Sequence, residues 1–144
     1  MEAYLIATAC TKFEKKADQT FKNLTEEVYS DLLKSAKVEN GNMIGQAWFG
    51  NCGMGTFGQN NIRGQVCFTP LVQKKLFPER VGIINVEGGC ATGSMAFHGA
   101  WKDVISGTED VSLAIGVEKI YQPNQPEKIQ EIYDGGIDQF DRSE

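Results

Sequence analysis

Short apolar runs alternate with helically spaced segments along this chain, and this order constrains the fold more than any other feature. Four runs have the length and composition of β-strands, and they span residues 3–10, 43–49, 81–86 and 111–117. Helix signals fill the intervals between them, at residues 20–38, 64–77 and 91–106. Strands that alternate with helices favour parallel neighbours, because each helix returns the chain to the same edge of the sheet. We therefore expect an α/β fold with a mostly parallel sheet of about four to five strands.

The first run, 3–10, is continuously apolar and is expected to be a central strand that is buried on both faces. The segment 20–38 has apolar residues at helical spacing, and Asn40-Gly41 is expected to end that helix. The Gly- and Asn-rich stretch 50–64 indicates a loop.

Pro70 lies inside the expected helix 64–77, so the helix either restarts there, with Thr69 as its N-cap, or kinks. After Tyr121 the sequence has prolines, acidic residues and glycines but no clear core pattern. We therefore expect a partial domain over residues 1–121, followed by the start of a loop region or a mobile tail over 122–144.

Composition excludes several function classes. The 14 basic and 19 acidic residues give a net charge of −5, which leaves no basic surplus for binding nucleic acid. The longest apolar run is far shorter than the ~20 residues of a membrane helix, and no basic segment precedes it as in a signal peptide. The four cysteines form no CxxC pair, which argues against a metal site and favours reduced thiols. We expect a cytoplasmic protein without a membrane partner.

A strand-to-helix turn around Cys90 is the strongest chemical signal. Gly88 and Gly89 separate the strand 81–86 from the helix 91–106, and glycines permit the unusual φ angles of a tight turn. The turn places Cys90 at the start of the helix, where free N–H groups and the helix dipole stabilise a thiolate. The helix is apolar nearly all round, which predicts a buried helix. The residues alone leave two interpretations open, a catalytic nucleophile and a structural buried cysteine.

The stretch Glu87-Gly88-Gly89-Cys90-Ala91-Thr92-Gly93-Ser94-Met95-Ala96 resembles the nucleophile region of thiolases, in particular the sterol-carrier-protein-type branch and acetyl-CoA acetyltransferases. The similarity extends to Thr11-Lys12-Phe13, to Gly64-Gln65 and to the segment 110–119, which reads Asp-Val-Ser-Leu-Ala-Ile-Gly-Val-Glu-Lys. It covers residues 3–121 in family order, which corresponds to the N-terminal portion of a thiolase.

The resemblance implies one half of a thiolase fold, with Cys90 as the catalytic residue. In that family the cysteine takes the acyl group of an acyl-CoA as a thioester. It then passes the group to the carbanion of a second acyl-CoA (Claisen condensation), or the reaction runs backwards as thiolysis of a 3-ketoacyl-CoA. A backbone oxyanion hole stabilises the developing charge. The resemblance implies coenzyme A or acyl-CoA as substrate, no tightly bound cofactor and a place in lipid metabolism; which residues bind the coenzyme is unknown.

The chain departs from the family in length. The second half of a thiolase supplies a histidine that activates the nucleophile and a second catalytic cysteine. The single histidine here, His98, lies about two helical turns (~12 Å) beyond Cys90, so we expect a packed helix residue rather than the base. The chain is therefore expected to be inactive or partner-dependent alone. The alternative is a non-catalytic truncated or split chain that acts as an oligomerisation or acyl-CoA-binding partner.

The apolar surface that a half-thiolase exposes predicts a homo-oligomer, or a partner chain that supplies the missing half. The sequence contains two weaker signals of a functional site. The pattern GxGxxG at residues 53–58 opens into no helix directly, so it indicates a flexible loop rather than a nucleotide site. Glu118 and Glu87 follow strands, and either can order nearby loops or simply be a surface charge.

Overall fold

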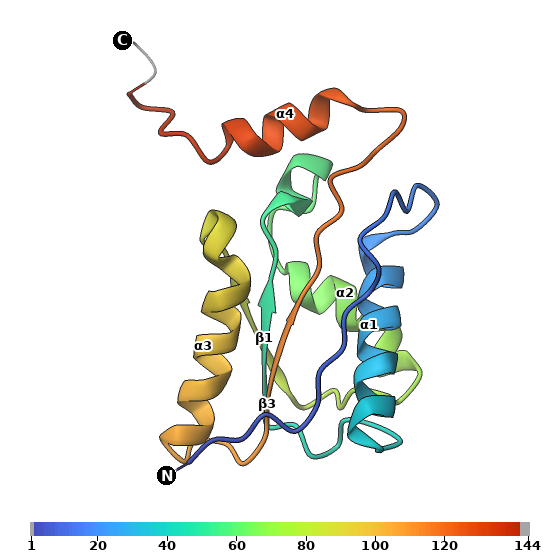
Figure 1. The fold of residues 1–144 in the computed structure, drawn as a ribbon, viewed down its shortest axis with the longest axis vertical. Helices are drawn as coiled ribbons and strands as arrows, with labels where there is room; N and C mark the ends of the chain where they lie inside the picture. Colours follow the sequence, from blue (N-terminus) through green and yellow to red (C-terminus); the bar gives the residue numbers. More distant parts are fainter. Residues whose placement is uncertain (1, 142–144) are drawn as a thin grey trace.

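The structure is a computed structural model that describes residues 2–141. Its elements in chain order are α1 (Phe21–Ala36), β1 (Gln46–Gly50), the 3₁₀ turn η1 (Gly53–Phe57), α2 (Arg63–Gln73), β2 (Gly82–Val86), the 3₁₀ turn η2 (Gly89–Ala91), α3 (Thr92–Ile105), β3 (Ser112–Gly116) and α4 (Glu127–Asp134). Figure 1 shows the strands in the middle of the molecule, with α4 across the end at which they finish.

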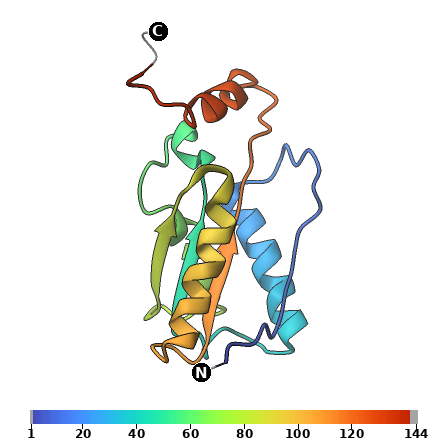
Figure 2. The same ribbon diagram turned by 60° about the vertical axis from the view of Figure 1, so that its left-hand side comes forward.

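The sheet is parallel and has the order β2-β1-β3. Gln46 of β1 is paired with Gly82 of β2 and with Ser112 of β3, so the three strands start at one level. Helix α3 covers one face of the sheet, and α1 and α2 cover the other (Figures 1 and 2). The expected α/β architecture with a parallel sheet is confirmed, although the described residues form three strands and not four to five.

The missing strand is the N-terminal run. Residues 3–10 are extended, but they pair with no strand in the described part of the chain. Tyr4, Leu5 and Ile6 are 77%, 68% and 66% exposed. The prediction of a central strand buried on both faces is therefore wrong. An apolar run is extended by its own preference, but it becomes a strand only where another strand supplies the hydrogen bonds.

Helix α1 begins as its sequence indicates. Thr20 is the N-cap: its side chain accepts the backbone N–H of Asn23, and the Asn23 side chain accepts the N–H of Thr20. The helix ends at Ala36, before the expected Asn40-Gly41, because Lys37 adopts a left-handed conformation with φ +57°. The Lys37 and Val38 N–H groups then close the last turn on Lys34 and Leu33.

Helix α2 runs through Pro70 without a restart. The Thr69 hydroxyl donates to the Gln65 carbonyl inside the helix and does not act as an N-cap. The helix ends at Gln73, short of the expected residue 77. Because proline has no backbone N–H, the Val66 carbonyl receives no helical hydrogen bond from residue 70.

The core lies between the sheet and the layer of α1 and α2. Tyr29 of α1, Phe68 of α2 and Phe77 pack their rings together, with 4.5 Å between the Phe68 and Phe77 centroids. Phe49 of β1 joins them edge-on against Phe68. These four rings are at most 2% exposed, so this layer fixes the position of the strands and their ends.

The C-terminal segment contains a helix that the sequence did not indicate. Of the expected tail 122–144, residues 127–134 form α4, and residues 142–144 lie outside the described part. No residue of α4 is fully buried. The division at residue 121 and the mobility of the tail stay predictions.

Candidate functional site

The turn between β2 and α3 holds Cys90, and its two glycines differ in how strongly the backbone requires them. Gly89 has a φ of +57°, a conformation that side chains disfavour. At Gly88 a Cβ would meet only the sulfur of Met95, the end of a flexible and half-exposed side chain that can move. The expected glycine turn is therefore present, and it carries the chain directly from the strand end into η2.

Hydrogen bonds fix the shape of this turn. The Thr92 hydroxyl accepts the Gly88 N–H at 2.9 Å and donates to the Gly89 carbonyl at 2.7 Å. The Glu87 carboxylate accepts the Gly89 N–H at 2.6 Å. Cys90 therefore lies on a backbone that is clamped on both sides, two residues ahead of the first residue of α3, and its side chain is exposed.

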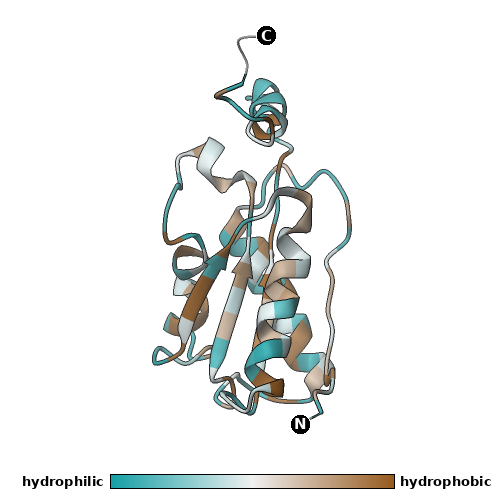
Figure 3. Cartoon of the chain, turned by 90° about the vertical axis from the view of Figure 1, so that its left-hand side faces the viewer, coloured by the Kyte–Doolittle hydropathy of each residue, from teal (hydrophilic) through white to brown (hydrophobic). Residues whose placement is uncertain are grey.

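Helix α3 is buried on one side only, so the expectation of a fully buried helix is wrong. Ala96, Gly99 and Ala100 pack towards the sheet, and a Cβ on Gly99 would collide with the ring of Trp48. Met95, Phe97 and Trp101 are 44%, 55% and 42% exposed. Figure 3 faces this helix and shows polar and apolar residues mixed along it. Small residues determine the packed side, and the large ones face outwards.

His98 lies on the exposed side of α3 and stacks on Trp101, with 5.4 Å between the ring centroids. It follows Cys90 by eight residues, as the sequence requires. The described hydrogen bonds include none from His98, and nothing directs its ring towards the turn. The structure does not bring together the two residues that a cysteine–base pair would need.

A second polar cluster joins the ends of β1 and β3. The Glu118 carboxylate, just beyond β3, accepts the N–H groups of Cys52 at 2.9 Å and Gly53 at 3.0 Å. The amide of Asn51 donates to Glu118 at 3.3 Å and to the Val117 carbonyl at 2.7 Å. The sequence left two interpretations of Glu118 open, a residue that orders a nearby loop and a simple surface charge, and the hydrogen bonds support the first.

The segment with the GxGxxG pattern is not a flexible loop. Residues Gly53–Phe57 form η1, which is anchored by Glu118 and ends at Gly58 with a φ of +94°. Arg63 donates to the carbonyls of Asn51 and Asn60, which ties the rest of the segment to the start of α2. No helix follows the glycines directly, and the geometry of a nucleotide-binding turn is missing here.

The other cysteines differ from Cys90 in their surroundings. Burial is the largest cause that raises the pKa of the Cys52 thiol. The hydrogen bond and negative charge of Glu87 and the charge of Glu118 raise this pKa further, and the positive charge of Arg63 lowers it by less. The Cys52 thiol donates to Glu87 at 3.5 Å. Cys67 is fully buried, and burial raises its pKa. Cys10 is exposed on the unpaired N-terminal segment.

Sequence reasoning missed the part that Asn51, Arg63 and Asn85 take in this region. Asn85 accepts the Gly64 N–H at 2.6 Å and so joins the end of β2 to the start of α2. Their only signal is position, since Asn51 and Asn85 are polar residues at strand ends and Arg63 is a charged residue at the start of a helix. Within residues 2–141, no group of three or more His, Cys, Asp or Glu side chains converges to hold a metal ion. None of the helices described there is long and apolar enough to cross a membrane.

Comparison with known proteins matches nearly the whole chain to one family. The family described as "Thiolase, N-terminal domain" matches residues 3–136. The chain is 32% identical over 117 residues to benzoylsuccinyl-CoA thiolase subunit BbsB of Thauera aromatica, and 31% identical over 117 residues to an acetyl-CoA acetyltransferase of Methanocaldococcus jannaschii. Each alignment covers 81% of this chain but 28% of the relative.

Proposed function

Because the chain belongs to the thiolase family, whose N-terminal domain it carries, we propose that it is the nucleophile-bearing part of an acyl-CoA acyltransferase with Cys90 as the acyl-accepting residue. The substrates proposed are coenzyme A thioesters, without a tightly bound cofactor. The remaining catalytic groups come from a polypeptide segment that this chain does not span, since it corresponds to 28% of each relative.

One observation carries the choice of Cys90. Among the described cysteines, it alone combines an exposed thiol with a fixed strand-to-helix turn. Cys67 is buried, Cys52 donates to a carboxylate, and Cys10 lies on an unpaired segment. An exposed thiol on a rigid backbone can meet a thioester carbonyl in a reproducible orientation.

The proposed chemistry has two steps. The Cys90 thiolate attacks the carbonyl carbon of an acyl-CoA, the new carbon–sulfur bond forms, and coenzyme A leaves as its thiolate. The acyl group then moves from Cys90 to the carbanion of a second acyl-CoA, which regenerates the cysteine thiolate. In the reverse direction, coenzyme A attacks the acyl-cysteine after cleavage of a 3-ketoacyl-CoA.

The proton of the Cys90 thiol needs an acceptor, and none of the hydrogen bonds found within residues 2–141 joins this exposed thiol to one. A general base typically contributes a factor of ~10²–10⁴ to the rate. His98 is the only histidine of the chain, and it stacks on Trp101 about two turns along α3. We therefore expect slow acylation of the isolated chain and near-background turnover.

The test compares the four cysteines in one protein. The chain is treated with limiting iodoacetamide, and separately with acetyl-CoA, and the modified positions are quantified by mass spectrometry. Cys90 should be alkylated fastest and should be the position that gains an acetyl group. Cys90→Ala should lose the acetyl adduct, whereas Cys10→Ala, which removes the other exposed thiol, should keep it.

Equal alkylation of Cys10 and Cys90, or an acetyl adduct that survives in Cys90→Ala, would refute the assignment. Thiolysis is measured in parallel on acetoacetyl-CoA. Robust turnover by the chain alone would show that no further segment is needed, and would refute the incomplete-enzyme part of the proposal.

The second candidate function is a non-catalytic one, an oligomerisation or acyl-CoA-binding partner. It is favoured by one exposed side of α3, where Phe97 and Trp101, one helical turn apart, are exposed together. Such a surface marks a contact with another chain. We propose a homo-oligomer through this region, for which sedimentation should show a dimer or larger species. Phe97→Glu should return the protein to a monomer, and a compact monomer of the unchanged chain at micromolar concentration would refute it.

A further inference from the structure

Alternate residues of β1 face α3, and their contacts show how the helix lies across the strand. Trp48 lies against Gly99, in the middle of α3. Two residues further along the strand, a Cβ added to Gly50 would lie 3.0 Å from the methyl group of Thr92, the first residue of α3. Because side chains two residues apart on a strand point to the same side, Cys52 is directed towards the residues that precede Thr92.

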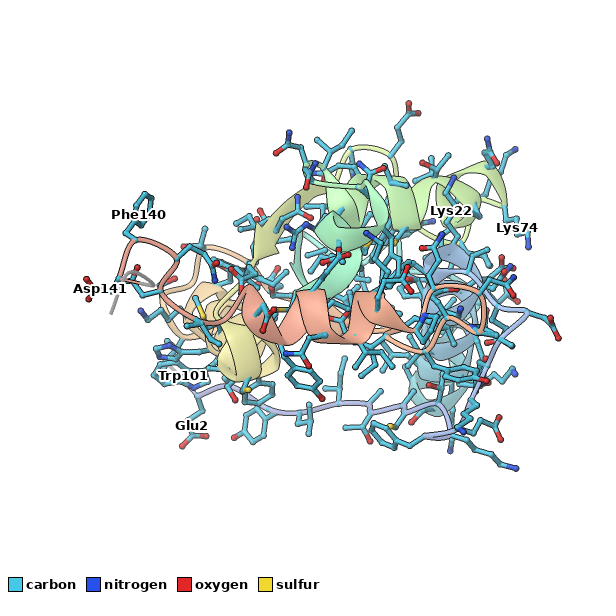
Figure 4. The ribbon with its side chains drawn as sticks, turned by 90° about the horizontal axis from the view of Figure 1, so that it is seen from above. Glu2, Lys22, Lys74, Trp101, Phe140 and Asp141 are labelled. Carbon is cyan, nitrogen blue, oxygen red and sulfur yellow. The ribbon has the colours of Figure 1, made fainter. Side chains whose placement is uncertain are left out.

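One carboxylate oxygen connects Cys52 to the turn that holds Cys90. Glu87 Oε1 accepts the Cys52 thiol at 3.5 Å and the Gly89 N–H at 2.6 Å. Gly89 immediately precedes Cys90, so a single side chain links the Cys52 thiol to the backbone of the other cysteine. The parallel pairing of β1 with β2 brings the two together, although they are far apart in sequence. Figure 4 looks onto this end of the molecule, with α4 across it.

The surroundings of the two thiols give them different roles towards an oxidant. Cys90 is exposed just ahead of α3, where the helix dipole favours the thiolate, the form that reacts with oxidants. Cys52 is half-buried, and burial together with the charge of Glu87 raises the pKa of its thiol. An oxidant therefore meets Cys90 first, and Cys52 is the neighbouring thiol that can react with the product.

The other two cysteines are not placed for this second role. Cys67 is fully buried, and its sulfur lies 3.9 Å from the sulfur of Met54. Cys10 lies on the N-terminal segment, where its thiol donates to the carbonyl of Thr11. Neither shares a hydrogen-bond partner with the Cys90 turn in the described part of the chain.

Glu87 is the side chain that must move before the two sulfurs can bond. A disulfide needs Cα atoms about 4.4–6.8 Å apart, so the carboxylate has to leave its place between the cysteines. The residue is exposed, and its side chain can turn into the solvent. The same movement breaks the hydrogen bond that holds the Cys52 thiol, and this thiol is then free to approach Cys90.

We propose that Cys52 and Cys90 form a disulfide when a peroxide oxidises the exposed thiol. The Cys90 thiolate attacks one oxygen of hydrogen peroxide, the O–O bond breaks, and a sulfenic acid forms. The hydroxide released takes up the proton of the original thiol as water. The Cys52 sulfur then attacks the sulfenic sulfur, the S–S bond forms, the S–O bond breaks, and the hydroxide leaves with the Cys52 proton as water. Two thiols lose two electrons in total, and one peroxide is reduced to two water molecules.

The disulfide itself does not require acyl transfer, and only its effect on acylation rests on the proposed function. A linked Cys90 has no thiolate to attack a thioester, so acylation stops. A dithiol such as dithiothreitol attacks the S–S bond and returns both thiols. The pair is thus a reversible modification site, which protects Cys90 from further oxidation to the sulfinic acid.

The test maps the cross-link in the whole chain. Trypsin places each of the four cysteines in a different peptide, at residues 1–12, 38–63, 64–74 and 81–102. The reduced protein, at low micromolar concentration, is treated with a small excess of hydrogen peroxide. Free thiols are then blocked, and linked peptides are quantified by mass spectrometry without reduction. The Cys52–Cys90 link should exceed every other pair by about tenfold or more, because neighbouring thiols react at a high effective concentration.

The same treatment in concentrated urea shows whether the fold is the cause. Unfolding separates Cys52 from Cys90, so the preference for this pair should disappear. A preference that persists in urea would refute the proposal, and so would equal linkage of Cys90 to Cys10 and to Cys52 in the folded protein.

Two variants separate the roles of the thiols. Cys52→Ser should leave a sulfenic acid on Cys90, which dimedone traps and mass spectrometry locates. Cys10→Ser is the matched control that removes the other exposed thiol, and it should keep the Cys52–Cys90 link. The proposal fails if the unchanged chain accumulates as much dimedone adduct on Cys90 as Cys52→Ser does.

A last arm measures the effect on acylation. Acetyl-CoA is added to reduced protein, to oxidised protein, and to oxidised protein after treatment with dithiothreitol and its removal. Acetylation of Cys90 should be lost on oxidation and should return with the dithiol. If the link forms but the reduced protein gains no acetyl group, the proposed function fails and the disulfide stands. If Cys90 is acetylated but the link does not form, the disulfide is refuted and the proposed function stands.

Discussion

Alanine in place of Gly99 or Gly93 should change stability in opposite directions, although both glycines lie on α3. At Gly93 nothing lies within 4 Å of an added Cβ, and its φ is helical. Alanine is favoured over glycine in a helix by about 0.8–1 kcal/mol, somewhat less near a helix end. Gly93→Ala should therefore raise the free energy of unfolding by about 0.5–1 kcal/mol.

At Gly99 the added Cβ would lie 2.6 Å from Cε2 of Trp48, so the indole must move. The indole N–H donates to the Asp103 carboxylate at 2.6 Å, and the Ser112 hydroxyl donates to the same oxygen at 2.8 Å. Overpacking costs about 1–3 kcal/mol, and a weakened hydrogen bond to a charged group adds up to roughly 1.5 kcal/mol. After the propensity gain of about 1 kcal/mol, these costs leave a net loss, and Gly99→Ala should lower the free energy of unfolding by up to about 3.5 kcal/mol.

The two variants should thus differ by about 0.5–4.5 kcal/mol in urea unfolding followed by circular dichroism, with Gly93→Ala the more stable. Asp103→Asn supplies the coupled control. The effects of Gly99→Ala and Asp103→Asn should not add, because both act through the Trp48 indole. If Gly99→Ala is as stable as Gly93→Ala, the indole moves without cost, and the packing of α3 on β1 does not depend on this contact.

Burial raises the pKa of the Tyr29 phenol, so the folded state keeps this proton to a higher pH than the unfolded state does. The free energy of unfolding should therefore fall as the pH rises above ~10, by up to about 1.4 kcal/mol per pH unit. In urea unfolding, Tyr29→Phe should lack this pH dependence. Glu87→Gln removes a charge that raises the pKa of Cys52, so alkylation of Cys52 at pH 7.5, followed by mass spectrometry, should become faster, and a slower rate would contradict the arrangement. Glu118→Gln replaces a charged hydrogen-bond acceptor with a neutral one, so hydrogen exchange of the Gly53 amide should become about tenfold faster. Unchanged hydrogen exchange would show that the carboxylate does not order this loop.

Local patterns predicted most of the regular structure. The strand expected at 81–86 lies at Gly82–Val86, and the strand expected at 111–117 lies at Ser112–Gly116. The helix expected to begin at Thr20 has Thr20 as its N-cap. These features depend on capping and on hydrophobic period, which neighbouring residues determine.

The errors at residues 3–10 and in α3 have a shared physical origin, since each concerns a partner far away in sequence. The run 3–10 is apolar and extended, but its own residues do not determine whether another strand pairs with it. The composition of α3 does not show that Gly99 packs on Trp48 while Phe97 faces outwards. The role of Glu118 depends on Cys52 and Gly53, about 65 residues earlier in the chain.

In the candidate site, too, the local features could be predicted from the sequence and the longer-range contacts could not. The turn around Cys90 could be predicted, because two glycines before a cysteine and a helix are a local pattern. The clamp by Thr92 and Glu87 could not, because the turn must first form before these side chains reach its backbone. The resemblance to thiolases predicts that Cys90 is the nucleophile, which stays a prediction, and the structure shows the hydrogen bonds that hold the backbone of this turn.

The cavity of about 480 Å³ between residues 3–9 and β3 also affects how these molecules associate at high concentration. Residues 3–9 are uncharged and extended, and β3 is an edge strand of the described sheet. If the N-terminal segment of one copy pairs with β3 of another, two copies that exchange segments form a closed dimer. A head-to-tail exchange does not close, and each addition leaves a free β3 edge at one end of the assembly and a free segment at the other. An exposed strand edge of this kind is a site at which a linear assembly grows.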